Sequence, residues 1–148
     1  MTAEARHRFV VARLWAGGGA TALVAALAAI VVILVASGLF GVPVLVPYGE
    51  GVWGGVGAAA YSVSAAVAAL AATGLLHLLL NGTPRARSFF VTITLLLTAI
   101  TVIVPLSVEA DRGARIATAA GNLFLGVLIT GTLSGVLHSA IRAGRLVR

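Results

Sequence analysis

Two histidines are the first residues of this sequence whose type and spacing could do chemistry. His77 and His138 each lie a few residues before the end of a long apolar segment. If the two segments are neighbouring helices, the imidazoles would meet at one depth, where they could share a metal ion or bind a haem as axial ligands. Two histidines are a weak ligand set for zinc, and the helix dipole alone favours an imidazole near a helix C-terminus. We therefore expect no cofactor and no metal, with His77 and His138 as the candidates if one binds.

Three carboxylates form a second candidate site. Glu50 lies in one loop, and Glu109 and Asp111 lie in another. A bundle of antiparallel helices would bring both loops to the same end. Paired carboxylates can carry out acid–base catalysis, as in some hydrolases and cyclases, but they can also simply keep the loops in water. Both interpretations stay open, and these three residues are the candidate catalytic residues.

The distribution of charge indicates which kinds of chemistry to exclude. No Asp, Glu, Lys or Arg lies within the windows 14–49, 51–84, 88–108 and 116–141. Proton- and cation-coupled transporters usually need a buried ionisable group within a span. The chain has no cysteine, which excludes a thiol–disulfide oxidoreductase and an iron–sulfur protein. A non-enzymatic protein is therefore favoured.

The uncharged windows are also the elements that must position any site. A helix needs about 20 apolar residues to cross a bilayer, and each window is at least that long. The composition agrees, because 60% of the 148 residues are hydrophobic and 9% are charged. The pattern predicts an all-α, four-helix transmembrane bundle in up-down-up-down order, with Ser88 as the candidate cap of the third helix. We expect spans over approximately 16–40, 52–80, 88–108 and 116–141, within a single membrane domain comprising residues 1–148.

Arginine sets the expected orientation. Eight of the ten arginines lie in the N-terminal segment, the second loop and the C-terminal segment, which share one side of a four-span protein. The positive-inside rule therefore places both termini in the cytoplasm, and we expect the chain to lie in the plasma membrane. The same arginines account for the pI of about 11.6, since no basic stripe with interleaved aromatic residues indicates nucleic-acid binding. The first apolar run is longer than that of a typical signal peptide, so we expect it to be retained.

Small and hydroxyl residues recur on one face of each expected helix. Such residues form the seams between membrane helices, because lipid chains provide no hydrophobic drive for helix association. The fourth helix carries a second small face, Gly131 and Gly135, which predicts contact with a second copy or with another membrane protein. The predicted helix-packing residues are Ser62, Ala66, Ala69, Thr73, Thr94, Thr98, Thr101, Asn122, Gly126, Gly131 and Gly135.

Four short segments together resemble a known family. They are Val42-Pro43-Val44 followed by Pro47, Thr83-Pro84-Arg85-Ala86-Arg87, Pro105-Leu106-Ser107, and Asn122-Leu123-Phe124-Leu125-Gly126-Val127-Leu128-Ile129. Over about residues 14–141 the chain resembles the small four-span actinobacterial membrane proteins grouped as domain of unknown function 6069. A composition rich in Ala, Gly and Val, with arginine in place of lysine, agrees with such a source. The resemblance implies a four-span fold, and it implies no activity because the family has none assigned.

These observations rank three functions. The favoured one is a non-enzymatic accessory or interaction subunit, because the sequence carries no buried charge, thiol, metal cluster or nucleotide-binding loop. The alternative is a small-molecule binder or transporter that holds an apolar substrate in the seam of Ser, Thr and small residues. The third is an intramembrane enzyme that uses the outer carboxylates. The expected partners are the lipid bilayer and, through the fourth helix, a second copy or another membrane protein.

Overall fold

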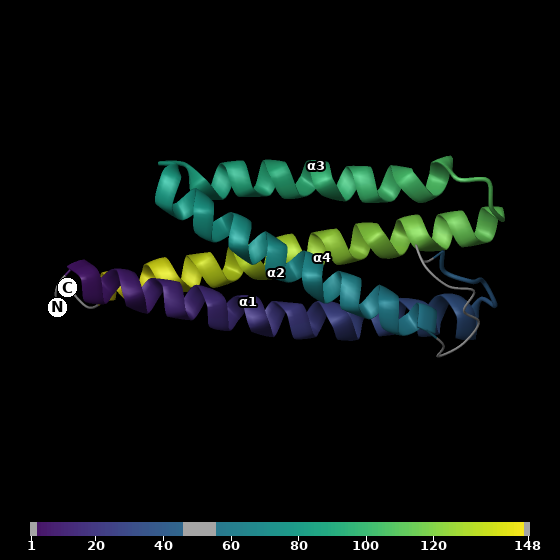
Figure 1. Cartoon of the computed structure of the whole chain (residues 1–148), viewed down its shortest axis with the longest axis horizontal. Helices are drawn as coiled ribbons and strands as arrows, with labels where there is room; N and C mark the ends of the chain where they lie inside the picture. Colours follow the sequence, from purple (N-terminus) through teal and green to yellow (C-terminus); the bar gives the residue numbers. More distant parts are fainter. Residues whose placement is uncertain (1–2, 46–55, 147–148) are drawn as a thin grey trace.

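All regular secondary structure in the described part of the chain is helical. The structure, a computed structural model, describes residues 3–45 and 56–146. Its helices are α1 (Ala3–Ile33), which continues into the π-helical segment η1 (Leu34–Leu39), α2 (Val56–Gly82), α3 (Ala86–Ser107) and α4 (Arg112–Leu146), and no strand occurs in these ranges. Successive helices run antiparallel, so α1 begins and α4 ends at the same end of the bundle (Figure 1). The predicted four-helix, up-down-up-down fold is confirmed.

Each helix contains a segment long and apolar enough to cross a membrane. These segments are Val11–Leu39, Gly57–Gly82, Ala86–Ser107 and Arg112–Ser139. Large apolar side chains, among them Leu23, Leu78, Ile100 and Ile116, are exposed on the outside of the bundle. Water would disfavour such a surface and lipid chains would solvate it. The chain therefore fits a multi-pass membrane protein.

Several helix boundaries differ from the predicted spans, and α4 begins at Arg112 rather than at 116. Helix α1 starts at Ala3 rather than at 16, and α4 continues to Leu146 rather than 141. Both extensions carry arginine, a good helix former, so the helices continue beyond the apolar windows. The prediction that Ser88 caps the third helix was wrong, because α3 begins at Ala86 with Arg85 at the N-cap and no side-chain cap hydrogen bond.

The first two helices end in different ways. Gly41 adopts φ 64°, and the Val42 N–H donates to the Ala36 carbonyl over 2.8 Å, which closes the end of η1. A residue in the left-handed conformation at this position favours glycine. At the end of α2, the Thr83 hydroxyl and N–H both donate to the Leu79 carbonyl, over 2.8 and 2.9 Å. Pro84 then prevents the helix from continuing.

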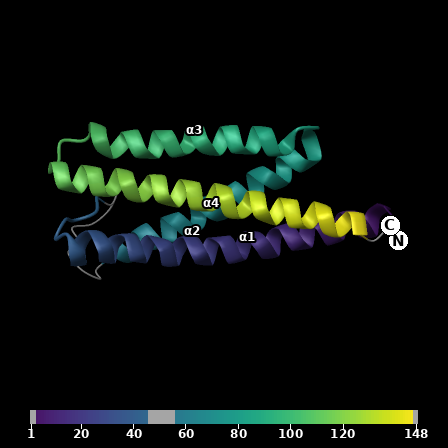
Figure 2. The ribbon, with the colours of Figure 1, turned by 180° about the vertical axis from the view of Figure 1, so that it is seen from behind.

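The helices pack unequally. Helix α1 packs along both α2 and α4, and α3 packs along α4. Helix α2 is inclined, so that it runs beside α1 at one end of the bundle and meets α3 near the Thr83–Arg85 turn at the other (Figures 1 and 2). Small residues such as Ala25, Ala29 and Ala69 are fully buried where helices meet. The inclination of α2 leaves α2 and α3 separated over part of their length.

Candidate functional site

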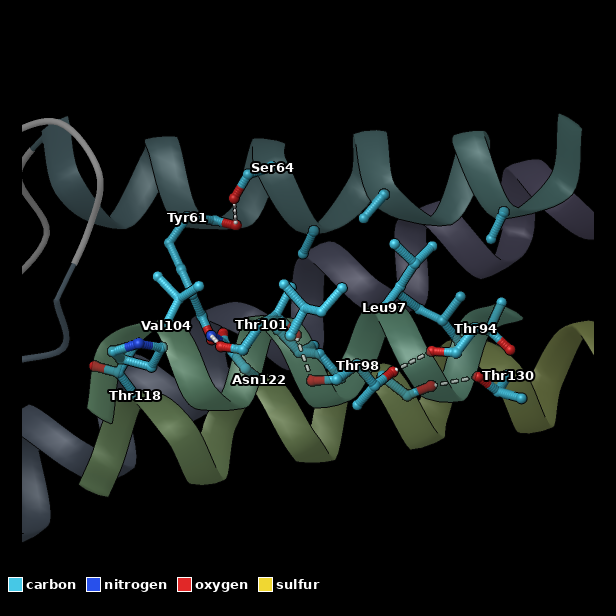
Figure 3. A pocket seen from close by; sticks show the side chains of 18 of the residues that line it. Tyr61, Ser64, Thr94, Leu97, Thr98, Thr101, Val104, Thr118, Asn122 and Thr130 are labelled. Carbon is cyan, nitrogen blue, oxygen red and sulfur yellow. Dashed lines mark hydrogen bonds between the residues drawn. The ribbon is translucent and has the colours of Figure 1, made fainter. Parts of the chain in front are cut away.

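A pocket of about 730 Å³ lies between α2, α3 and α4. Its floor consists of buried residues, including Ala65, Thr98 and Leu125, whereas rim residues such as Ala68 and Leu97 are exposed. The volume falls within the range of small-molecule sites, and the lining is mostly apolar, as such sites usually are. The rim residues belong to α2 and α3, so the pocket opens sideways between these two helices (Figure 3).

A proline in α3 creates the polar end of this pocket. Pro105 has no N–H, so the carbonyl of Thr101, four residues earlier, receives no helical hydrogen bond from it. The Asn122 side chain on α4 supplies the missing donor, because its Nδ2 donates to the Thr101 carbonyl over 2.7 Å. In a bilayer every backbone carbonyl needs such a partner. Asn122 thus links α4 to α3 at the carbonyl that Pro105 leaves without a helical donor.

Tyr61, on α2, completes the polar group. Because the Thr101 carbonyl can only accept, Asn122 must turn its Nδ2 toward it and present Oδ1 to the other side. The Tyr61 hydroxyl donates to that Oδ1 over 2.9 Å. Figure 3 shows the Tyr61 side chain reaching from α2 across the pocket to Asn122. Tyr61 is 6% exposed, so its hydroxyl depends on this partner.

The other hydroxyl groups of the lining bond within their own helices. Six of them each donate to a carbonyl three or four residues earlier, over 2.7–2.9 Å: Ser64, Thr94, Thr98, Thr101, Thr118 and Thr130. The Thr118 oxygen also accepts from the Leu45 N–H over 2.8 Å, which fixes the segment after η1 against α4. Every one of these oxygens keeps a lone pair.

The two candidate histidines have different surroundings. The His77 ring lies against the Trp15 ring of α1, with centroids 6.3 Å apart, and its Nε2 is 3.4 Å from the Asn81 amide nitrogen. His138 is exposed. The ends of α2 and α4 that carry them diverge, α2 toward α3 and α4 toward α1 (Figure 2). Among the residues that the structure describes, no three His, Cys, Asp or Glu side chains lie close enough to hold a metal.

Two of the three candidate carboxylates lie among the described residues. The Asp111 Oδ2 accepts from the N–H groups of Gly113 and Ala114, over 2.9 and 3.4 Å, at the start of α4. This is the arrangement of a helix N-cap. Glu109 is exposed, and Glu50 lies outside the described residues. Neither Glu109 nor Asp111 lines the pocket.

The predicted helix-packing residues fall into three groups. Ala69, Thr73, Thr94 and Thr98 are buried, and a Cβ added to Gly126 would overlap the Thr98 side chain. Ser62, Ala66 and Asn122 are half-buried and Thr101 is exposed at the pocket rim. Gly131 and Gly135 are exposed, and a Cβ at either would meet nothing within 4 Å.

Tyr61 is the site residue that the sequence reasoning missed. A tyrosine inside an apolar span needs a hydrogen-bond partner, and Asn122 was a polar residue near the same end of another span. Pro105 was a further signal, because a proline within a helix leaves the carbonyl four residues earlier, that of Thr101, without its helical donor.

Comparison with known proteins gives a family and no activity. The model of a family of unknown function (DUF6069) matches residues 9–139. A search of curated proteins and a search of solved structures each gave no match. The match covers all four membrane-spanning segments in full, and it includes Tyr61, Pro105 and Asn122. The chain is a member of the DUF6069 family.

Proposed function

We propose that this protein binds a small, largely apolar molecule, which enters the lateral pocket from the bilayer. The observation that carries the proposal is the pocket itself, about 730 Å³ in volume and open between α2 and α3. Its rim residues Ala68, Leu97 and Ile100 are exposed on membrane-spanning segments. A molecule dissolved in the lipid would reach this rim without crossing water. The distribution of the arginines along the sequence supports an orientation with both termini in the cytoplasm.

Filling the rim tests the binding proposal. In Ala68→Trp, an indole at the exposed rim of α2 would occupy the opening without entering the core. We expect the variant to lose most of the apolar molecules that co-purify with the wild-type protein in mild detergent, measured by mass spectrometry of the extracted protein. Ala71→Trp is the matched control, because Ala71 is exposed on the same helix and does not line the pocket. Equal retention in both variants would refute binding in this pocket.

We also propose that α4 associates with a second membrane-spanning helix, in the manner of an accessory or interaction subunit. The specific observation in favour is that Gly131 and Gly135, four residues apart, are exposed with open space where a side chain would lie. Such a pair lets the backbone of another helix approach closely.

Enlarging these glycines tests the association. We expect Gly131→Leu combined with Gly135→Leu to abolish chemical cross-linking to a second copy or to a co-purifying protein in native membranes. Gly19→Leu is the control, because Gly19 is equally exposed on α1 with nothing within 4 Å of an added Cβ. Unchanged cross-linking in the double variant would contradict the role of this face.

A further inference from the structure

The pocket is short of hydrogen-bond donors. Six lining Ser and Thr hydroxyls have given their hydrogens to backbone carbonyls, and the Tyr61 hydroxyl has given its hydrogen to Asn122. None of these hydroxyls can donate to a ligand group that only accepts, such as an ester or quinone carbonyl, without giving up its present bond. The lone pairs of the same oxygens stay available to a ligand that donates.

Asn122 adds one donor and one acceptor. Its Nδ2 has two hydrogens, of which one bonds to the Thr101 carbonyl. The second Nδ2 hydrogen has no acceptor among the described residues. Its Oδ1 accepts from Tyr61 and keeps a second lone pair. The polar end of the pocket therefore suits a group that both donates and accepts, and a hydroxyl does both with one oxygen.

The charge of the lining selects a neutral ligand. No Asp, Glu, Lys or Arg is among the described residues that line the pocket. An ammonium head group would donate hydrogen bonds as well as a hydroxyl does, but here its charge would be buried without a counter-charge, which is costly. A carboxylate or phosphate would meet the same penalty and would find only one free donor, the second Nδ2 hydrogen of Asn122.

The shape of the pocket selects an elongated ligand. Along α3 and the residue that follows it, the lining runs from Thr94 to Val108, which corresponds to about 21 Å at a rise of about 1.5 Å per residue. The Tyr61–Asn122 pair lies toward the end of the pocket near Pro105 and Val108, and apolar residues such as Ala72 and Ile129 lie toward the other end. An apolar chain can therefore extend along the groove from a polar head.

We propose that the pocket recognises a neutral, long-chain lipid alcohol, and this inference rests on the binding function proposed above. The hydroxyl donates to the Tyr61 oxygen or to Asn122 Oδ1 and accepts from the second Nδ2 hydrogen of Asn122. The hydrocarbon chain occupies the apolar part of the groove. Compared with its methyl ether, the alcohol makes one additional hydrogen bond, which corresponds to about five- to tenfold in affinity.

Photolabelling of the full chain in nanodiscs tests the head-group preference. The probes are a long-chain primary alcohol with a diazirine in its chain, the matching methyl ether, and the methyl ester of the matching acid, each at the same loading. Labelled peptides are mapped by tandem mass spectrometry, and labelling of α2, α3 and α4 pocket residues is compared. We expect the alcohol to label these residues about five- to tenfold more than the ether or the ester.

A variant that changes the chemistry of the pocket sharpens the test. In Asn122→Leu combined with Pro105→Ala, the alanine N–H serves the Thr101 carbonyl and the Tyr61 hydroxyl loses its acceptor. Its hydrogen then becomes available to a ligand carbonyl, so the preference for the alcohol over the ester should disappear. The comparison of probes on the wild-type protein decides the proposal even if this variant does not fold.

The outcomes separate the two proposals. Equal labelling of the pocket by alcohol, ether and ester, with all three reduced by Ala68→Trp, would overturn the alcohol preference and leave ligand binding intact. Pocket labelling that is absent, or that Ala68→Trp does not reduce, would overturn the binding function and the alcohol inference with it.

Discussion

Replacing Asn122 with leucine is expected to destabilise the bundle by about 2–4 kcal/mol, because the change leaves two polar groups without partners. The Thr101 carbonyl, which Pro105 deprives of its helical donor, loses the amide that now serves it at 2.7 Å. The Tyr61 hydroxyl loses the acceptor to which it donates at 2.9 Å. A leucine side chain is close in size to asparagine, so loss of volume contributes little. The free energy of unfolding is measured by SDS titration in mixed micelles.

Pro105→Ala should partly rescue that variant. Alanine restores an N–H four residues after Thr101, so the carbonyl recovers a partner within α3. We expect the double variant to regain about 1–2 kcal/mol, whereas Pro105→Ala alone changes the stability little, since Asn122 already serves the carbonyl. Adding Tyr61→Phe should recover part of the remainder by removing the second unpaired group. An Asn122→Leu protein as stable as the wild type, or no coupling between positions 105 and 122, would contradict this account.

The sequence was sufficient for the fold because the relevant signal is local. Each apolar window between charged residues is long enough to span a bilayer, and a helix satisfies its own backbone there without help from the rest of the chain. The predicted third span, 88–108, differs from α3 by two residues at its start and one at its end. The start of α1 and the end of α4 were predicted wrongly, because hydropathy indicates only the part of a helix that lies in the bilayer. Both helices contain arginine beyond that part and continue through it.

The site was harder to predict because it depends on how the helices tilt. The sequence places Thr94, Thr98 and Asn122 on helix faces of small or polar residues, and periodicity alone predicts that such faces pack against other helices. Only the inclination of α2 decides that part of the seam is open and that Tyr61 reaches Asn122. The similar depth of His77 and His138 was equally visible in the sequence, but depth alone could not show that His77 lies beside Trp15 of α1 while His138 is exposed.

Gly126 provides the second large expected effect, because it sets how closely α3 and α4 approach. A Cβ at this position would overlap Cγ2 and Oγ1 of Thr98 and would lie 2.8 Å from its Cβ. Thr98 cannot easily turn away, since its hydroxyl donates to the Thr94 carbonyl over 2.7 Å and its side chain is only 7% exposed. Gly126→Val should therefore force the two helices apart and reduce the free energy of unfolding by about 1–3 kcal/mol.

A double-mutant cycle connects this effect to the helix contact rather than to the loss of a glycine. Thr98→Ala removes two of the three nearest atoms, so it should recover part of the stability lost in Gly126→Val, which would give a favourable coupling of about 1 kcal/mol. Gly19→Val, at an exposed glycine of α1 with nothing within 4 Å of an added Cβ, should change the stability little. Pro105→Ala should not rescue Gly126→Val, because it supplies a hydrogen bond and relieves no overlap. If Gly19→Val were as damaging as Gly126→Val, backbone preference and not the α3–α4 contact would explain the loss, and rescue by Thr98→Ala would then be absent.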